Sequence, residues 1–128
     1  MTNILIADDH DLVRDTIAAY LETVDGFKVF TAHDLASALE VMSGVDSIDL
    51  LILDYNMPGM NGLQGLERAC TSYPATKVAL MSGVAKREIA NNAMERHARG
   101  FIPNHYQPPL SLTQLNSFYQ ESDTYLLT

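Results

Sequence analysis

Near its middle the sequence reads Leu51-Ile52-Leu53-Asp54-Tyr55-Asn56-Met57-Pro58-Gly59-Met60-Asn61-Gly62. The short apolar run that opens this stretch is typical of a buried strand. The proline and the two glycines that follow are typical of a tight loop. Asp54 stands where the strand gives way to the loop, so the strand is expected to present this carboxylate without burying it.

Similar apolar runs predict further buried strands at residues 4–7, 29–30, 78–81 and 101–102. Apolar residues at helical spacing lie between them, at 13–21, 35–42, 63–73 and 89–94, and a fifth such stretch covers 110–119. Gly44 and Gly100 are expected to mark helix ends. Alternating strands and helices favour a doubly wound α/β fold, a five-stranded parallel sheet with helices on both faces.

Composition limits the size, location and partners of the protein. With 128 residues, 47% of them hydrophobic, the chain suits one domain over residues 1–128, and the tail after about residue 120 is expected to fray. No apolar run reaches the roughly 20 residues that span a bilayer, so a cytoplasmic protein without membrane contact is expected. The formal net charge of −8 disfavours direct nucleic-acid binding, which needs basic residues.

Three carboxylates follow predicted strands: Asp8 and Asp9 after the first, and Asp54 at the end of the third. In doubly wound sheets, ligands bind beyond the carboxyl ends of the strands where the strand order reverses. Acids that converge there repel one another unless a cation compensates, and oxygen ligands suit Mg²⁺. Alternatively, Asp9 or Asp11 caps the helix that follows the first strand.

The order of these motifs resembles the receiver domains of bacterial two-component response regulators, from residue 4 to about residue 119. Ile4-Leu5-Ile6-Ala7-Asp8-Asp9-His10 is similar to the family's acidic pair, and Asp54 with Met57-Pro58-Gly59-Met60-Asn61-Gly62 is similar to its phosphoacceptor loop. Ser82 stands where the family has a phosphoryl-binding hydroxyl, and Phe101 where it has an aromatic switch.

The resemblance implies a flavodoxin-like receiver fold and a phosphoryl-accepting signalling switch. Asp54 would accept the phosphoryl group. Asp9 and Asp54 would contact Mg²⁺ directly, Asp8 would act largely through water, and Asn56 would contribute its backbone carbonyl. Such a switch takes part in its own phosphorylation but is not a dedicated turnover enzyme.

The resemblance also implies how the signal is passed on. Ser82 would move toward the phosphate while Phe101 turns inward, reshaping the face made by the fourth helix, fifth strand and fifth helix. A histidine kinase or phosphotransfer protein would be the phosphodonor, and a second copy of the chain would dock on that face. No output domain is expected within these 128 residues. Locally, Ser82 also suits a helix cap, and Phe101 an ordinary core aromatic.

The fifth strand departs from the family pattern. Gly100-Phe101-Ile102-Pro103 is followed by Asn104, where the family carries a lysine that pairs with the phosphoryl oxygens. A neutral hydrogen bond is about half as strong as a charge-assisted one. Three alternatives follow: weaker switching through Asp54, substitution by another cation (Lys86, Arg87 or His105), or signalling without phosphate.

Two rival functions use a similar sheet. A phosphatase of the haloacid-dehalogenase type needs a second aspartate two residues after its nucleophile, where this chain has Asn56. A degenerate receiver would instead be a phosphate-independent protein-binding module. The three acids favour the phosphoryl-accepting switch, because a domain without that chemistry has little need for mutually repelling carboxylates.

Overall fold

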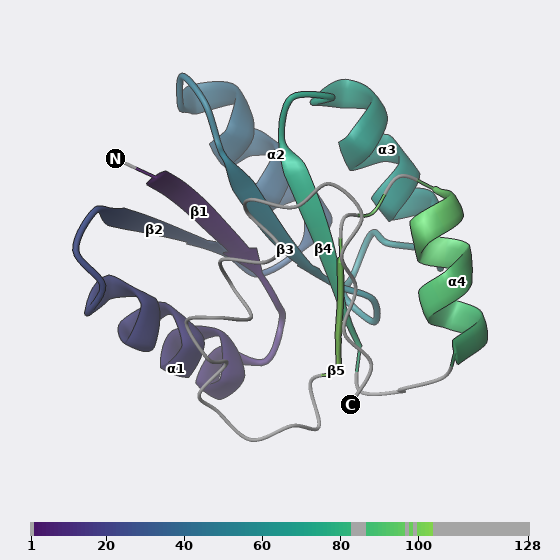
Figure 1. The fold of residues 1–128 in the computed structure, drawn as a ribbon, viewed down its shortest axis with the longest axis horizontal. Helices are drawn as coiled ribbons and strands as arrows, with labels where there is room; N and C mark the ends of the chain where they lie inside the picture. Colours follow the sequence, from purple (N-terminus) through teal and green to yellow (C-terminus); the bar gives the residue numbers. More distant parts are fainter. Residues whose placement is uncertain (1, 83–86, 97, 99, 104–128) are drawn as a thin grey trace.

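Five parallel strands form one sheet at the centre of the computed structural model, which describes residues 2–82, 87–96, 98 and 100–103. The strands are β1 (Thr2–Ala7), β2 (Phe27–Ala32), β3 (Leu50–Asp54), β4 (Lys77–Ser82) and β5 (Gly100–Pro103). Their order across the sheet is β2-β1-β3-β4-β5 (Figure 1). All neighbouring pairs are parallel, which confirms the predicted sheet.

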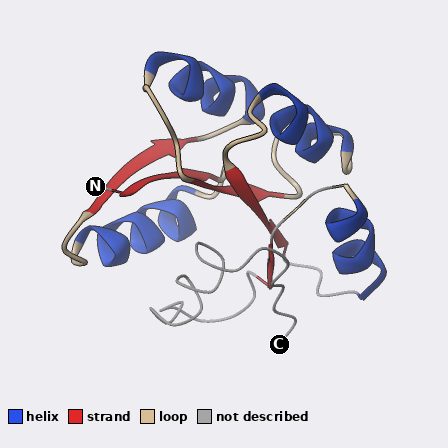
Figure 2. Cartoon of the chain, turned by 45° about the horizontal axis from the view of Figure 1, so that its top comes forward, coloured by secondary structure: helices blue, strands red, loops and turns tan. Residues whose placement is uncertain are grey.

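Helices cover both faces of the sheet, as predicted. They are α1 (Asp11–Glu22), α2 (Leu35–Gly44), α3 (Gln64–Ser72) and α4 (Arg87–Glu95). The helix α1 lies on one face, and α2 and α3 lie on the other (Figure 2). The expected fifth helix and the tail lie outside the described residues.

The alternation of side chains along the strands divides the core into two layers. Ile4, Ile6 and Ile52 pack with Ile17 and Leu21 of α1. The intervening residues, Leu5, Leu51 and Leu53 among them, pack on the other face against α2 and α3, and Ala93 of α4 joins that layer. Because β3 is buried on both faces, its sequence is continuously apolar rather than alternating.

One predicted helix end is confirmed and another is wrong. Gly44 is the last residue of α2, as predicted, whereas Gly100 is the first residue of β5 rather than a helix terminus. His10 occupies the N-cap position of α1 and its side chain makes no capping hydrogen bond, while Asp11 is already inside the helix. Neither Asp9 nor Asp11 is therefore the N-cap residue, so their presence needs another explanation.

The loop after β3 is anchored to its surroundings. Met57 and Met60 are buried, and the carbonyl of Pro58 accepts a hydrogen bond of 3.1 Å from the backbone N–H of Leu35. Gly59 has a φ of +91°, and a Cβ there would lie 3.1 Å from the Cβ of Leu35. Only glycine combines this conformation with so close an approach to α2.

Candidate functional site

The strand register brings two aspartates together at the carboxyl edge of the sheet. Ala7 of β1 pairs with Leu53 of β3, so Asp8 and Asp54 are the next residues on neighbouring strands. The strand order reverses here, because β1 lies between β2 and β3. The sequence therefore predicted the location of the cluster correctly from the positions of the strand ends.

Four side chains form the cluster. Asp8, Asp9, His10 and Asp54 each offer one ligand atom, and these atoms all lie within 4.8 Å of one another. Asp8 and Asp54 are 0% and 1% exposed, whereas the side chain of Asp9 is 35% exposed. The expectation that Asp54 is presented without burial is thus wrong, because the strands and loops on either side enclose its carboxylate.

In each of the two buried carboxylates, only one oxygen accepts a hydrogen bond. Asp8 Oδ1 accepts a hydrogen bond of 2.9 Å from the backbone N–H of His10, and Asp54 Oδ1 accepts one of 3.4 Å from that of Asn56. Asp8 Oδ2 and Asp54 Oδ2 are buried with no hydrogen-bond partner. Buried polar atoms without partners are rare in proteins and call for an explanation, such as an ion.

Burial and like charge perturb Asp54. Loss of solvent, followed by repulsion from the neighbouring Asp8, raises the pKa of Asp54 to about 7, against a weaker lowering effect of the Asn56 N–H. Two carboxylate charges within 4.8 Å of one another repel by roughly 3 kcal/mol or more at an effective dielectric constant of about 20. A cation placed among the acids would remove this penalty and favour their charged forms.

The donor set fits Mg²⁺, which prefers carboxylate oxygens and retains waters in its remaining positions. The unpartnered oxygens of Asp8 and Asp54 supply two such donors, and Asp9 is the third carboxylate. Exposure of Asp9 leaves one side of the cluster open to solvent.

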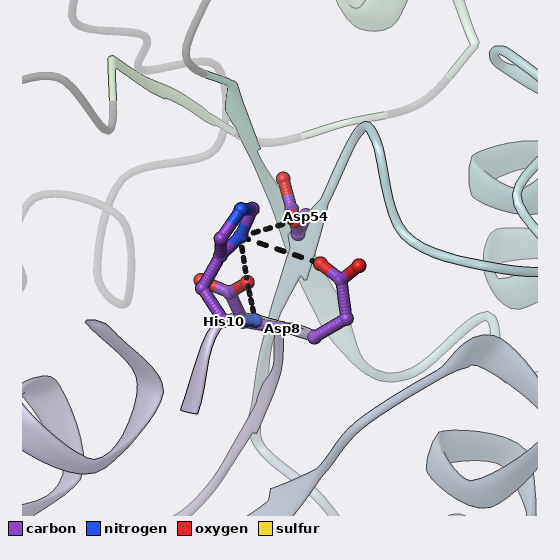
Figure 3. A group of neighbouring side chains, drawn as sticks. Asp8, His10 and Asp54 are labelled. Carbon is purple, nitrogen blue, oxygen red and sulfur yellow. Dashed lines mark hydrogen bonds and ion pairs between the residues drawn. The ribbon is translucent and has the colours of Figure 1, made fainter. Parts of the chain in front are cut away.

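His10 is the site residue that sequence reasoning missed. Its Nδ1 lies 3.0 Å from Asp8 Oδ1 and 3.9 Å from Asp54 Oδ2, so the ring faces the acids (Figure 3). A hydrogen bond and charge attraction from Asp8 raise the pKa of His10. The signal was available, because His10 directly follows the acidic pair at the end of a predicted strand.

The structure describes only some of the other predicted site residues in full. Asp54 pairs with Met81 across the sheet, so Ser82 comes one residue later on the adjacent strand, where it is fully buried. Asn56 is exposed in the turn after β3. The backbone of Phe101 lies in β5, paired with Leu80, but its side chain is outside the description. Asn104 lies outside the described residues.

The cations considered as substitutes for the missing lysine are not placed either. Lys86 and His105 lie outside the described residues, and Arg87 is described only as the first residue of α4.

Among the helices that the structure describes, none has the length and the apolar content needed to span a membrane.

Comparisons with known proteins agree with this architecture. The model of the response regulator receiver domain family matches residues 4–115. The chain is 40% identical over 105 residues to the glycerol metabolism activator of Pseudomonas putida, covering 80% of this chain and 47% of that protein. It is 25% identical over 119 residues to the response regulator UvrY of Escherichia coli K12, covering 93% and 55%.

A solved structure extends the likeness to three dimensions. The crystal structure of a LuxR family DNA-binding response regulator from Silicibacter pomeroyi superposes with a TM-score of 0.83 at 31% identity, covering 98% of this chain and 97% of that one. The chain spans about half the length of the curated relatives it matches. With the family model matching most of its length, the chain belongs to the response regulator receiver domain family.

Proposed function

We propose that this chain is the phosphoryl-accepting switch of a two-component phosphorelay, with Asp54 as phosphoacceptor and Mg²⁺ as cofactor. The observation that carries the proposal is the buried Oδ2 of Asp54, which has no hydrogen-bond partner and lies at a strand end beside two other acids. A structural aspartate would have its oxygens satisfied by the protein.

The proposed reaction forms an acyl phosphate. A carboxylate oxygen of Asp54 attacks the phosphorus of the donor, an O–P bond forms, and the bond from phosphorus to the donor breaks with its electron pair leaving on the donor. Bound Mg²⁺ would be held by Asp8, Asp9, Asp54 and the Asn56 carbonyl, and would supply positive charge for the acids and the phosphoryl oxygens. The protein contributes mainly positioning, which suits phosphoryl transfer.

The proposed switch uses the neighbouring strands. Ser82 is buried on β4 next to β3, which suits a hydroxyl that changes partner when Asp54 is modified. Phe101 would couple that change to the face formed by α4, β5 and the expected fifth helix, where a second copy of the chain would dock. Neither role requires turnover, so the domain would be a signalling switch and not a dedicated enzyme.

Partners follow from the family membership. We propose a histidine kinase or phosphotransfer protein as phosphodonor. The Silicibacter pomeroyi relative is a DNA-binding response regulator, but the net charge of −8 of this chain disfavours DNA contact by this part itself.

Intact-mass measurement after incubation with acetyl phosphate and Mg²⁺ tests the proposal. Wild type is expected to gain one phosphate, and Asp54→Asn none. Asn104→Lys is expected to increase the yield, because it adds a charge-assisted contact for the phosphoryl group. If wild type stays unmodified while Mg²⁺ still binds, the proposal fails and a phosphate-independent binding module becomes the better function.

A further inference from the structure

The His10 ring is aimed at all three carboxylates. Its Nδ1 lies 3.0 Å from Asp8 Oδ1, 3.3 Å from Asp9 Oδ1 and 3.9 Å from Asp54 Oδ2. The side chain is 62% exposed, so no tight packing forces the ring into this position. The interaction with the three carboxylates therefore accounts for the orientation of the His10 ring.

The backbone holds this histidine in place. His10 occupies the N-cap position of α1, where its N–H donates to Asp8 Oδ1 and its carbonyl accepts a 2.9 Å hydrogen bond from the Arg14 N–H. Its side chain makes no capping hydrogen bond. Hydrogen bonds thus fix the backbone of His10, whereas its imidazole does not cap the helix. The ring can therefore take part in the cation site.

The donor separations fit a shared metal. Imidazole nitrogens and carboxylate oxygens bind first-row divalent metals at about 2.1 Å. Two ligands at a right angle are then about 3.0 Å apart, and two opposite ligands about 4.2 Å apart. The 3.0 Å separation of Nδ1 from Asp8 Oδ1, which is a hydrogen bond in this structure, and the 3.3 Å separation from Asp9 Oδ1 match adjacent ligands, and 3.9 Å lies between the two arrangements.

We propose that His10 Nδ1 is a fourth protein ligand of the cation site, so that the site favours transition-metal divalent cations more than its three carboxylates alone would. Imidazole nitrogen suits such metals, whereas Mg²⁺ prefers oxygen. The buried oxygens of Asp8 and Asp54 that lack hydrogen-bond partners independently indicate a cation-binding site at the same place. The inference rests on the cation site of the proposed function but not on phosphoryl transfer.

Pulsed electron paramagnetic resonance of the full chain loaded with Mn²⁺ tests the inference directly. Wild type is expected to show the modulation of one imidazole nitrogen bound to Mn²⁺. The modulation is expected to vanish in His10→Gln and to persist in His33→Gln, whose side chain is exposed and pairs with Asp34 outside the site. Absence of nitrogen coupling in wild type would overturn the inference and leave His10 as a hydrogen-bond donor to Asp8.

Competition between cations provides a second readout. Displacement of Mn²⁺ by Co²⁺ and by Mg²⁺ gives the relative affinities of both. His10→Gln is expected to weaken Co²⁺ on the order of ten-fold or more while Mg²⁺ changes little, since metal affinity depends strongly on each ordered partner. Equal losses for both cations would overturn the inference.

The mass measurement with acetyl phosphate separates the two proposals. Nitrogen coupling without phosphorylation of Asp54 would refute the proposed function and support the role of His10. Phosphorylation of Asp54 without nitrogen coupling would support the proposed function and refute His10 as a metal ligand.

Discussion

At Asp54, burial and the carboxylate of Asp8 both favour the protonated acid and raise the pKa to about 7. The folded chain therefore holds this proton more tightly than the unfolded chain, in which an aspartate titrates near pH 4. Stability from this group is present at low pH and is lost as the pH rises from about 4 to about 7. Above that range the metal-free protein carries the full repulsion between the acids.

Asp54→Asn is expected to remove the loss of stability that ionisation of Asp54 causes. In the absence of divalent cations, the variant should become more stable than wild type as the pH rises from about 4 to 7, by on the order of 1–3 kcal/mol at pH 8. Urea unfolding across this pH range measures the difference. Added Mg²⁺ should narrow the gap by stabilising wild type. A gap independent of pH would show that the charge on Asp54 is not its cause.

At the scale of elements, the loop after β3 depends on the start of α3. Gly65 lies in the first turn of that helix, and its N–H donates a 2.7 Å hydrogen bond to the carbonyl of Met60. A Cβ at Gly65 would lie 2.8 Å from the Cα of Met60, so the helix approaches the loop as closely as glycine allows.

Gly65→Ala is expected to destabilise the fold by about 1–3 kcal/mol, because the added methyl group meets backbone that cannot move without shifting the loop. Gly44→Ala is the control, since that glycine is also helical and a Cβ there meets nothing within 4 Å. The control should be neutral or stabilising by about 0.4–1 kcal/mol. Equal effects in urea unfolding would contradict the close contact.

The start of α2 depends on a capping aspartate. Asp34 Oδ1 accepts a 2.7 Å hydrogen bond from the Ser37 N–H, and this bond lowers the pKa of Asp34. The carboxylate therefore stabilises the fold above its unfolded pKa near 4, and the contribution is lost as the pH falls through the lowered folded value.

Asp34→Ala should accordingly reduce the melting temperature by a few degrees at pH 7 and by less under acid conditions. Asp34→Asn should lose much less, because asparagine also caps. Thermal unfolding followed by circular dichroism measures both variants. A loss that is the same at both pH values would exclude a contribution from the carboxylate charge.

At the scale of the whole molecule, one large apolar side chain stands out near the site. Leu12 is 81% exposed, the only large hydrophobic residue so exposed in the described part of the chain. It lies in the first turn of α1, two residues after His10. Because Leu12 is so close in sequence to the cluster, we expect its side chain to contact the proposed phosphodonor protein.

Leu12→Ser is expected to slow phosphotransfer from the proposed histidine kinase about ten-fold, the loss expected when a contact worth about 1.4 kcal/mol is removed. Phosphorylation by acetyl phosphate should be unchanged, because the small donor needs no docking surface. Arg68→Ser, an exposed change on α3 across the sheet, is the control. Equal slowing with both donors would place the defect in the site itself.

The sequence by itself determined the five strands, the helices between them and the meeting of Asp8, Asp9 and Asp54. Apolar runs and helical spacing indicate which residues are buried on folding, and parallel strands bring their carboxyl ends to one edge of the sheet. These signals are local, so they can be read without knowing the packing.

Only the tertiary structure decided how the acids are enclosed and what faces them. The burial of Asp54, its half-satisfied oxygens and the approach of His10 depend on neighbouring strands, the register and the turn into α1. Asp54 was expected to be presented without burial because its own loop contains glycine and proline, but exposure is set by the elements around a residue. Burial and long-range distance are properties of the packed chain, and for that reason the chemistry of the cluster emerges only in three dimensions.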